Sequence, residues 1–122
     1  MRDGFMEDVD EALGRLARSR FRSGFHLTRA EREYYVAKGP AVIRRHAEDF
    51  VRQRLAPAWP VNDGRQTPMS GHPAFKAMHA CGCCCRGCLE KWHRAPRGRA
   101  LTEDEQARIV NLLMAWLERE MA

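Results

Sequence analysis

The sequence has no apolar run long enough to cross a membrane. Its wholly apolar stretches are short, whereas a helix that spans a bilayer needs about 20 such residues. The segment Met1 to Asp10 also lacks the basic and apolar regions of a secretory signal and carries several acids instead. We therefore predict a cytoplasmic protein without a membrane partner.

Cysteine is absent from the whole sequence except residues 81–88, where all five cysteines lie. An odd number of thiols this close together cannot all pair in unstrained disulfides. Thiols in the cytoplasm are in any case kept reduced. A scaffold held together by disulfides is therefore disfavoured.

The sequence also lacks the alternation of apolar and polar residues that marks a half-buried strand. Apolar residues recur instead at helical spacing, and the clearest stripe follows a capping box formed by Thr102 and Glu105. That stripe contains Ile109, Leu112, Leu113, Trp116 and Leu117. We predict an all-α fold, a small helical bundle of about five helices that forms a single domain over residues 1–122.

Local signals divide the first half of the chain into further helices. The opening helix is expected over residues 6–17, where apolar positions recur at three- and four-residue steps. Thr28 and Glu31 form a second capping box. Gly39 and Pro40 then end one helix and begin the next. Two helices should therefore meet in a tight turn.

A long irregular connection is expected over residues 57–71. It begins at a proline that ends the preceding helix, and it is rich in residues that favour turns. Such a long connection is unusual in a small domain. It is either a disordered insert or a segment held in place by something such as a metal site or a ligand.

Residues 79–93 contain all five cysteines and two of the five histidines. Thiolate sulfur and neutral imidazole nitrogen are the donors that close a tetrahedron around Zn²⁺. Cys85 and Cys88 form a C-x-x-C pair, which lets two sulfurs from one turn reach the same ion. The other ligands are open among His79, Cys81, Cys83, Cys84, His93 and the more distant His72. Three thiolates and one imidazole are the preferred set.

Three other kinds of cysteine chemistry compete with zinc. A redox C-x-x-C usually lies in a βαβ context, which is not visible here. An iron–sulfur cluster needs sulfurs that are less compressed along the chain. A nucleophilic thiol activated by His79 or His93 remains an alternative, because nearby arginines lower a thiol pKa.

Positive charge is concentrated in the middle of the chain. The net charge is +5 at pH 7, and almost all of the 21 basic residues are arginine. Arginine is well suited to phosphate and to stacking on bases, so a nucleic-acid partner is plausible. The candidate contacts are Arg18, Arg20, Arg22, Arg86, Arg94 and Arg97. The alternative is that these residues are simply solvated faces of helices.

Several motifs together resemble the bacterial and phage family called domain of unknown function 4186. The quoted segments are Arg20-Phe21-Arg22, Phe25-His26-Leu27, Ile43-Arg44-Arg45-His46-Ala47, Asn62-Asp63-Gly64, Gln66-Thr67-Pro68, Gly71-His72-Pro73, Cys84-Cys85-Arg86 and Cys88-Leu89-Glu90-Lys91-Trp92-His93. The resemblance covers residues 13–121 and implies a metal site built from Cys84, Cys85, Cys88, His72, His79 and His93. Cys81 and Cys83 depart from the family pattern, and no activity is implied.

Two functions remain open. The first is a binding module with a structural zinc site and an arginine-rich surface for nucleic acid or a protein partner. The second is a metal-dependent hydrolase or nuclease, with His72, His79 and Asp63 around an open zinc position and Arg86 steadying an anionic substrate.

Overall fold

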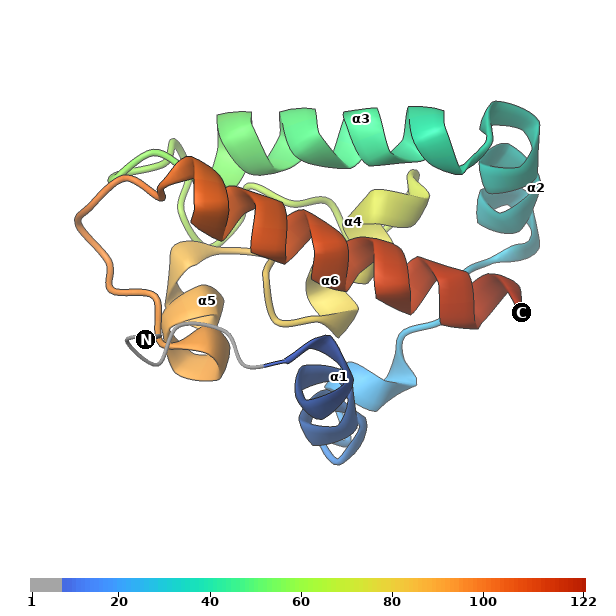
Figure 1. Cartoon of the computed structure of the whole chain (residues 1–122), viewed down its shortest axis with the longest axis horizontal. Helices are drawn as coiled ribbons and strands as arrows, with labels where there is room; N and C mark the ends of the chain where they lie inside the picture. Colours follow the sequence, from blue (N-terminus) through green and yellow to red (C-terminus); the bar gives the residue numbers. More distant parts are fainter. Residues whose placement is uncertain (1–7) are drawn as a thin grey trace.

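The computed structural model describes residues 8–122 and shows an all-α protein, as predicted (Figure 1). These residues form six α-helices and no strand, together with a 3₁₀ turn (η1) and a π-helical turn (η2). The helices are α1 (Val9–Ala17), α2 (Arg29–Lys38), α3 (Pro40–Phe50), α4 (Pro73–Ala80), α5 (Arg86–His93) and α6 (Glu103–Met121), and the turns are η1 (Arg22–Gly24) and η2 (Val51–Leu55). Met6, expected in the opening helix, lies outside the described residues.

Helix α6 is the central element of the fold. It runs beside α3 along the length of the molecule and also contacts α1 and α4 (Figure 1). Its predicted capping box is present, because Thr102 accepts from the Glu105 amide and the Glu105 carboxylate accepts from the Thr102 amide. The predicted stripe is buried at Ile109, Leu112, Leu113 and Leu117, while Trp116 is half-buried. This stripe anchors the core against the other helices.

The other sequence signals begin and end helices where they were expected. Thr28 and Glu31 form the reciprocal capping box of α2. Gly39 has a φ of 85°, which ends α2, and Pro40 opens α3. The predicted tight turn between α2 and α3 is therefore confirmed. Farther along the chain, η2 ends with a hydrogen bond from the Ala56 amide to the Val51 carbonyl.

Side-chain hydrogen bonds hold the long connection between η2 and α4 against the rest of the protein. Asp63 Oδ1 accepts from the Arg86 amide at 3.0 Å, and Thr67 Oγ1 donates to the Cys84 carbonyl at 2.8 Å. Gln66 also exchanges hydrogen bonds with Arg54. Two of these attachments end on the segment that carries the thiols, so the connection and the cysteine loop are ordered together.

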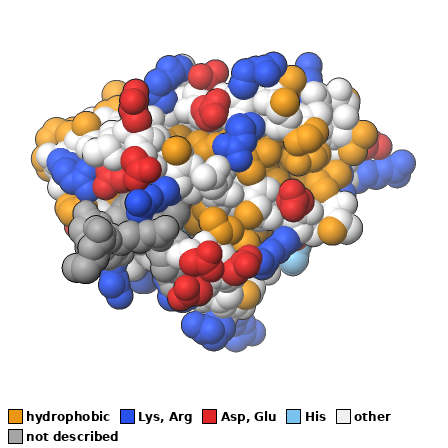
Figure 2. Space-filling model, viewed as in Figure 1, with side chains coloured by type: hydrophobic (Ala, Val, Ile, Leu, Met, Phe, Trp, Pro, Cys, Tyr) orange, Lys and Arg blue, Asp and Glu red, His pale blue; other side chains and the backbone are white. Residues whose placement is uncertain are grey.

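The face of the molecule in Figure 2 carries side chains of both signs of charge, with patches of apolar side chains between them. Within residues 8–122, the exposed large apolar side chains are Phe21, Val36, Trp59, Val61 and Met69. No helix within residues 8–122 combines the length and the hydropathy that crossing a membrane requires.

Candidate metal centre

Four of the cysteines lie on the turn between α4 and α5 and the fifth, Cys88, lies in the first turn of α5; the local sequence explains the shape of this segment. Helix α4 ends at Ala80 with Cys81 as its C-cap, and Gly82 follows with a φ of 67°, a conformation that residues other than glycine rarely adopt. A Cβ on Gly82 would lie 2.8 Å from Cγ of Trp92, so the turn packs directly against α5. Cys85 then caps α5 by accepting from the Cys88 amide.

Three thiols meet on this turn. The sulfurs of Cys84, Cys85 and Cys88 all lie within 4.8 Å of one another, and all three thiols are free. Sulfurs bound tetrahedrally to Zn²⁺ at about 2.3 Å would be about 3.8 Å apart. Small side-chain adjustments therefore suffice for the three sulfurs to bind one ion. The donor set fits a soft or borderline metal ion.

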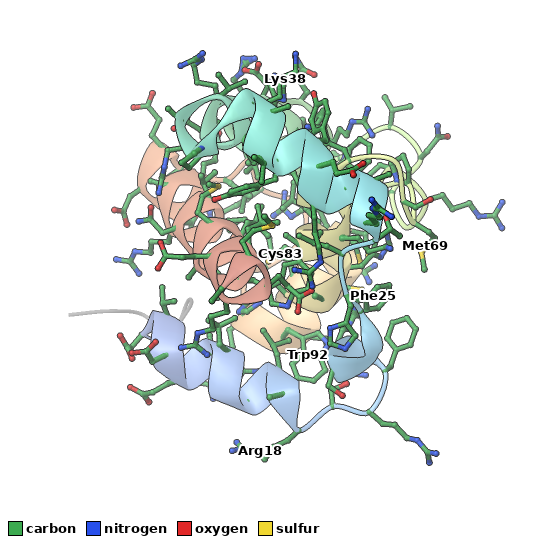
Figure 3. All side chains as sticks on the ribbon, turned by 90° about the vertical axis from the view of Figure 1, so that its right-hand side faces the viewer. Arg18, Phe25, Lys38, Met69, Cys83 and Trp92 are labelled. Carbon is green, nitrogen blue, oxygen red and sulfur yellow. The ribbon has the colours of Figure 1, made fainter. Side chains whose placement is uncertain are left out.

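Cys81 and Cys83 lie outside this group. Both side chains are fully buried, and Figure 3 shows Cys83 inside the molecule between the helices. Burial raises the pKa of both thiols, and the Cys83 thiol donates to the Cys81 carbonyl. These two cysteines therefore behave as neutral core residues.

No histidine belongs to the group of closely spaced donors within residues 8–122. His79 Nε2 lies 3.0 Å from the Thr67 carbonyl and 3.1 Å from the Pro68 carbonyl, to which it can only donate. His93 Nε2 likewise donates to the Cys81 carbonyl at 2.7 Å. Each of these nitrogens supports a loop next to the thiols.

His72, another predicted ligand, does not belong to the group of closely spaced donors and caps a helix instead. Its Nδ1 accepts from the Ala74 amide at 2.9 Å and thereby caps α4. The neutral ring must then carry its proton on Nε2, which lies 3.0 Å from Nδ1 of His46. Burial, with His46 nearby, lowers the pKa of His72 to about 4. A metal on Nε2 would force a proton onto Nδ1, against the Ala74 amide.

Arg22 is the residue whose importance the sequence did not reveal. It was expected on a nucleic-acid surface, yet its exposure is only 8%. Its Nη2 lies 3.2 Å from the Cys88 sulfur and its Nη1 lies 3.8 Å from the Cys84 sulfur. Nη1 also donates to the His79 carbonyl at 2.7 Å. The positive charge is thus directed at the thiols.

The three clustered thiols differ in acidity. A hydrogen bond from the Cys88 thiol, reinforced by Arg22, lowers the pKa of Cys84 to about 7, although burial opposes this. The same thiol–thiol bond raises the pKa of Cys88 because ionisation of Cys88 would break it. Burial raises the pKa of Cys85. Cys84 is therefore the first of the three to present a thiolate.

The other predicted arginines divide into one buried residue and four exposed ones. Arg86 is 1% exposed and donates to the backbone carbonyls of Leu55, Pro57, Pro96 and Arg99. It joins two loops rather than facing solvent. The exposed residues are Arg18, Arg20, Arg94 and Arg97, and Figure 3 shows Arg18 at the outer edge of α1.

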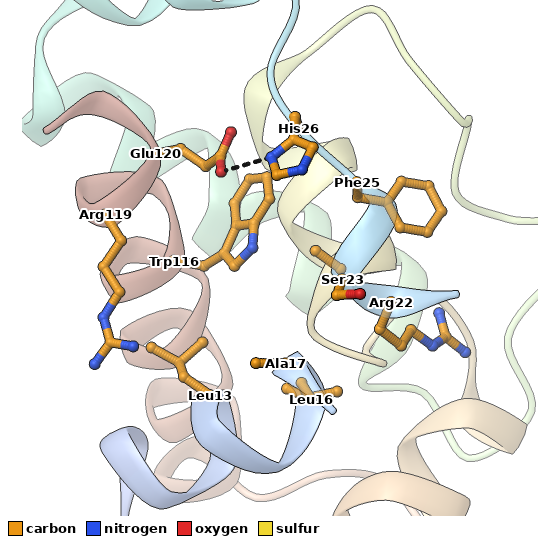
Figure 4. A pocket seen from close by; sticks show the side chains of 11 residues that line it. Leu13, Leu16, Ala17, Arg22, Ser23, Phe25, His26, Trp116, Arg119 and Glu120 are labelled. Carbon is orange, nitrogen blue, oxygen red and sulfur yellow. Dashed lines mark hydrogen bonds and ion pairs between the residues drawn. The ribbon is translucent and has the colours of Figure 1, made fainter. Parts of the chain in front are cut away.

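A pocket of about 220 Å³ lies on the other side of Arg22, between α1, η1 and α6 (Figure 4). Leu13 and Trp116 are among the residues that line it, and the guanidinium of Arg22 points away from them. At its edge, the Glu120 carboxylate is engaged by His26 and by the Leu27 amide. This pocket is therefore separate from the thiol group.

The family model described as Domain of unknown function (DUF4186) matches residues 10–118, which is nearly the whole chain. No solved structure matches the chain.

Proposed function

This chain belongs to the DUF4186 family, and because that description names no activity, we propose from the site alone that it is a small zinc-binding module. The observation that carries the proposal is the convergence of the Cys84, Cys85 and Cys88 sulfurs within 4.8 Å. Zn²⁺ would be held by these three thiolates and by a fourth donor such as water or a histidine that has changed its rotamer. Reduced thiols suit the cytoplasm.

A structural role for the ion is supported by where the three sulfurs lie. Cys84 is joined through its carbonyl to Thr67 in the long connection, while Cys88 lies in the first turn of α5. An ion bound to both would link the connection, the cysteine turn and α5. Binding at a free ion concentration of 100 times the Kd would stabilise the fold by about 2.7 kcal/mol.

Metal analysis of purified protein tests this proposal. We expect one ion per chain, with the thiols of Cys84, Cys85 and Cys88 protected from a thiol reagent until a chelator is added. Cys88→Ser should lose the ion. Cys83→Ala is the matched control, because Cys83 is a nearby cysteine outside the group, and it should keep the ion. Retention of the ion by Cys88→Ser, or a wild-type protein that binds none, would refute the proposal.

We also propose that the exposed arginines bind nucleic acid. Arg94 and Arg97 lie on the linker between α5 and α6, and Trp59 is 77% exposed beside Gly98 of the same linker. Cationic side chains next to an exposed aromatic ring suit a single strand, whose bases stack at about 1–3 kcal/mol each. A protein partner is the alternative that this surface would also allow.

A titration with fluorescent single-stranded and duplex oligonucleotides tests the nucleic-acid proposal. Arg97→Met should weaken binding and reduce the slope of log affinity against log salt by about one. Arg29→Met is the matched control, since Arg29 is exposed on α2 away from that linker. The absence of binding at low salt would count against nucleic acid and in favour of a protein partner.

The hydrolase alternative has one observation in its favour, because a set of three protein ligands leaves a coordination position for water. The residues expected around that position are engaged elsewhere, however. His79 donates to carbonyls of the connection, and Asp63 accepts from the Arg86 amide and from Gln66. We therefore favour the binding module.

A further inference from the structure

Three thiolates in a largely buried site create a charge that must be balanced. Cys84 and Cys85 are 8% and 9% exposed. Together with a divalent ion, three thiolates carry one net negative charge, and a buried charge is costly unless a counter-charge with hydrogen bonds accompanies it. The structure must therefore supply a cation if the ion is divalent.

Arg22 is placed to supply that cation. Its guanidinium lies within hydrogen-bonding distance of the sulfurs of both Cys88 and Cys84, and the bond to the His79 carbonyl fixes its orientation. The rings of Phe21 and Trp92 lie 5.0 and 5.9 Å from its Cζ. Aromatic faces of this kind stabilise a cation and cover it from solvent.

We propose that Arg22 makes the thiol site selective for a divalent thiophilic ion, such as Zn²⁺ or Cd²⁺, over trivalent arsenic. This inference rests on the proposed function and adds the charge class of the ion. A divalent ion displaces three thiol protons, and the resulting complex of charge −1 is neutralised by Arg22. Arsenous acid instead condenses with three thiols, forms three As–S bonds and releases three waters.

The arsenic complex is neutral, so the charge of Arg22 would remain uncompensated beside it. A divalent ion and arsenic(III) both accept three thiolates, so the thiol geometry alone does not discriminate between them. The guanidinium of Arg22 is the feature that discriminates between them. Arg22 acts through the sulfurs, which makes it a positioning residue rather than a ligand.

Substitution of Arg22 tests the proposal by comparing two ions in one protein. Arg22→Met should weaken Zn²⁺ and Cd²⁺ binding by about 10- to 100-fold, as removal of a partner of a metal ligand typically does. Affinity for arsenous acid should stay the same or rise. Arg22→Lys keeps the charge without the two-armed fork, and it should restore part of the preference for the divalent ion. Arg20→Met is the matched control and should change neither affinity.

The measurements are competition with a chromophoric chelator for Zn²⁺, the thiolate-to-metal absorption band for Cd²⁺, and protection of thiols for arsenous acid. Helical circular dichroism checks that each variant folds. Should Arg22→Met not fold, ¹⁵N NMR of the wild-type guanidinium decides. Zn²⁺ should slow solvent exchange of the Arg22 protons, whereas arsenous acid should not.

An equal loss of affinity for both ions in Arg22→Met, no loss for either, or identical guanidinium exchange with both ions would overturn the proposal. A wild-type protein that binds neither ion would refute the zinc proposal itself. A wild-type protein that binds Zn²⁺ normally while Arg22→Met shows no change in preference would refute only the role of Arg22.

Discussion

Replacement of Arg86 by methionine should destabilise the protein more than replacement of any exposed arginine. Arg86 is 1% exposed, and its two terminal nitrogens donate to carbonyls at 3.3, 2.8, 2.7 and 2.8 Å. These acceptors belong to the end of η2, to the start of the long connection and to the linker before α6. One guanidinium therefore joins two segments that are distant in the sequence.

The expected magnitude follows from these four bonds. A hydrogen bond to a charged group contributes about 1.5–3 kcal/mol, but the bonds share one cation and do not add fully. Removing the guanidinium leaves buried carbonyls without this donor, at about 1–3 kcal/mol each and not fully additive, which gives a total of about 3–5 kcal/mol. We expect a loss in this range for Arg86→Met. Arg86→Lys should recover little, because a single ammonium cannot reach four carbonyls in a plane.

Urea unfolding followed by circular dichroism provides the assay, with the midpoint and slope compared between variants. Arg97→Met is the matched control, because Arg97 pairs with Glu90 at 3.6 Å on the surface and should change stability by less than about 1 kcal/mol. A loss below about 1 kcal/mol for Arg86→Met would show that the two loops do not depend on this residue.

The remaining predictions concern pH, backbone shape and the ion. The pKa of His72 is lowered to about 4 against an ordinary value of 6.5, so unfolded chains bind the extra proton first and stability falls as pH drops from about 6.5 to 4. His72 accounts for about 3 kcal/mol of this loss in the free energy of unfolding. His72→Asn keeps a capping side chain on α4, and its stability to urea should fall less than that of wild type over this pH range. Parallel curves of stability against pH for the two proteins would exclude His72 as the cause. Gly82→Ala should cost about 1–3 kcal/mol because of its positive φ and its contact with Trp92, while Gly14→Ala, with nothing within 4 Å, should stabilise helix α1 by about 0.5–1 kcal/mol. Thermal unfolding measures both glycine variants, and equal effects would contradict this account of the cysteine turn. Chelation should lower the melting temperature of wild type but not of Cys88→Ser, and an unchanged wild-type midpoint would argue against a structural ion.

Local sequence was sufficient for most of the secondary structure. The capping boxes at Thr28 and Thr102 and the Gly39–Pro40 turn act within one helical turn of the chain, so their effect does not depend on distant partners. The periodic stripe of α6 predicted its buried face for the same reason. The local density of cysteines likewise predicted a cluster of thiols that could hold a metal ion, because Cys84, Cys85 and Cys88 are neighbours in the chain.

Tertiary structure decided the rest of the site. Nothing in the sequence distinguishes Arg22 and Arg86 from the exposed Arg94. Packing nevertheless directs Arg22 toward the sulfurs and Arg86 toward four backbone carbonyls. His72 was grouped with the thiols, yet its ring caps α4 and meets His46 from α3. Charge and residue type are properties of the sequence, whereas the direction of a long side chain depends on which helices surround it. The three thiols were predictable because they are close neighbours in the sequence, and their cationic partner was not, because Arg22 lies 62 and 66 residues away from Cys84 and Cys88 and meets them only through packing.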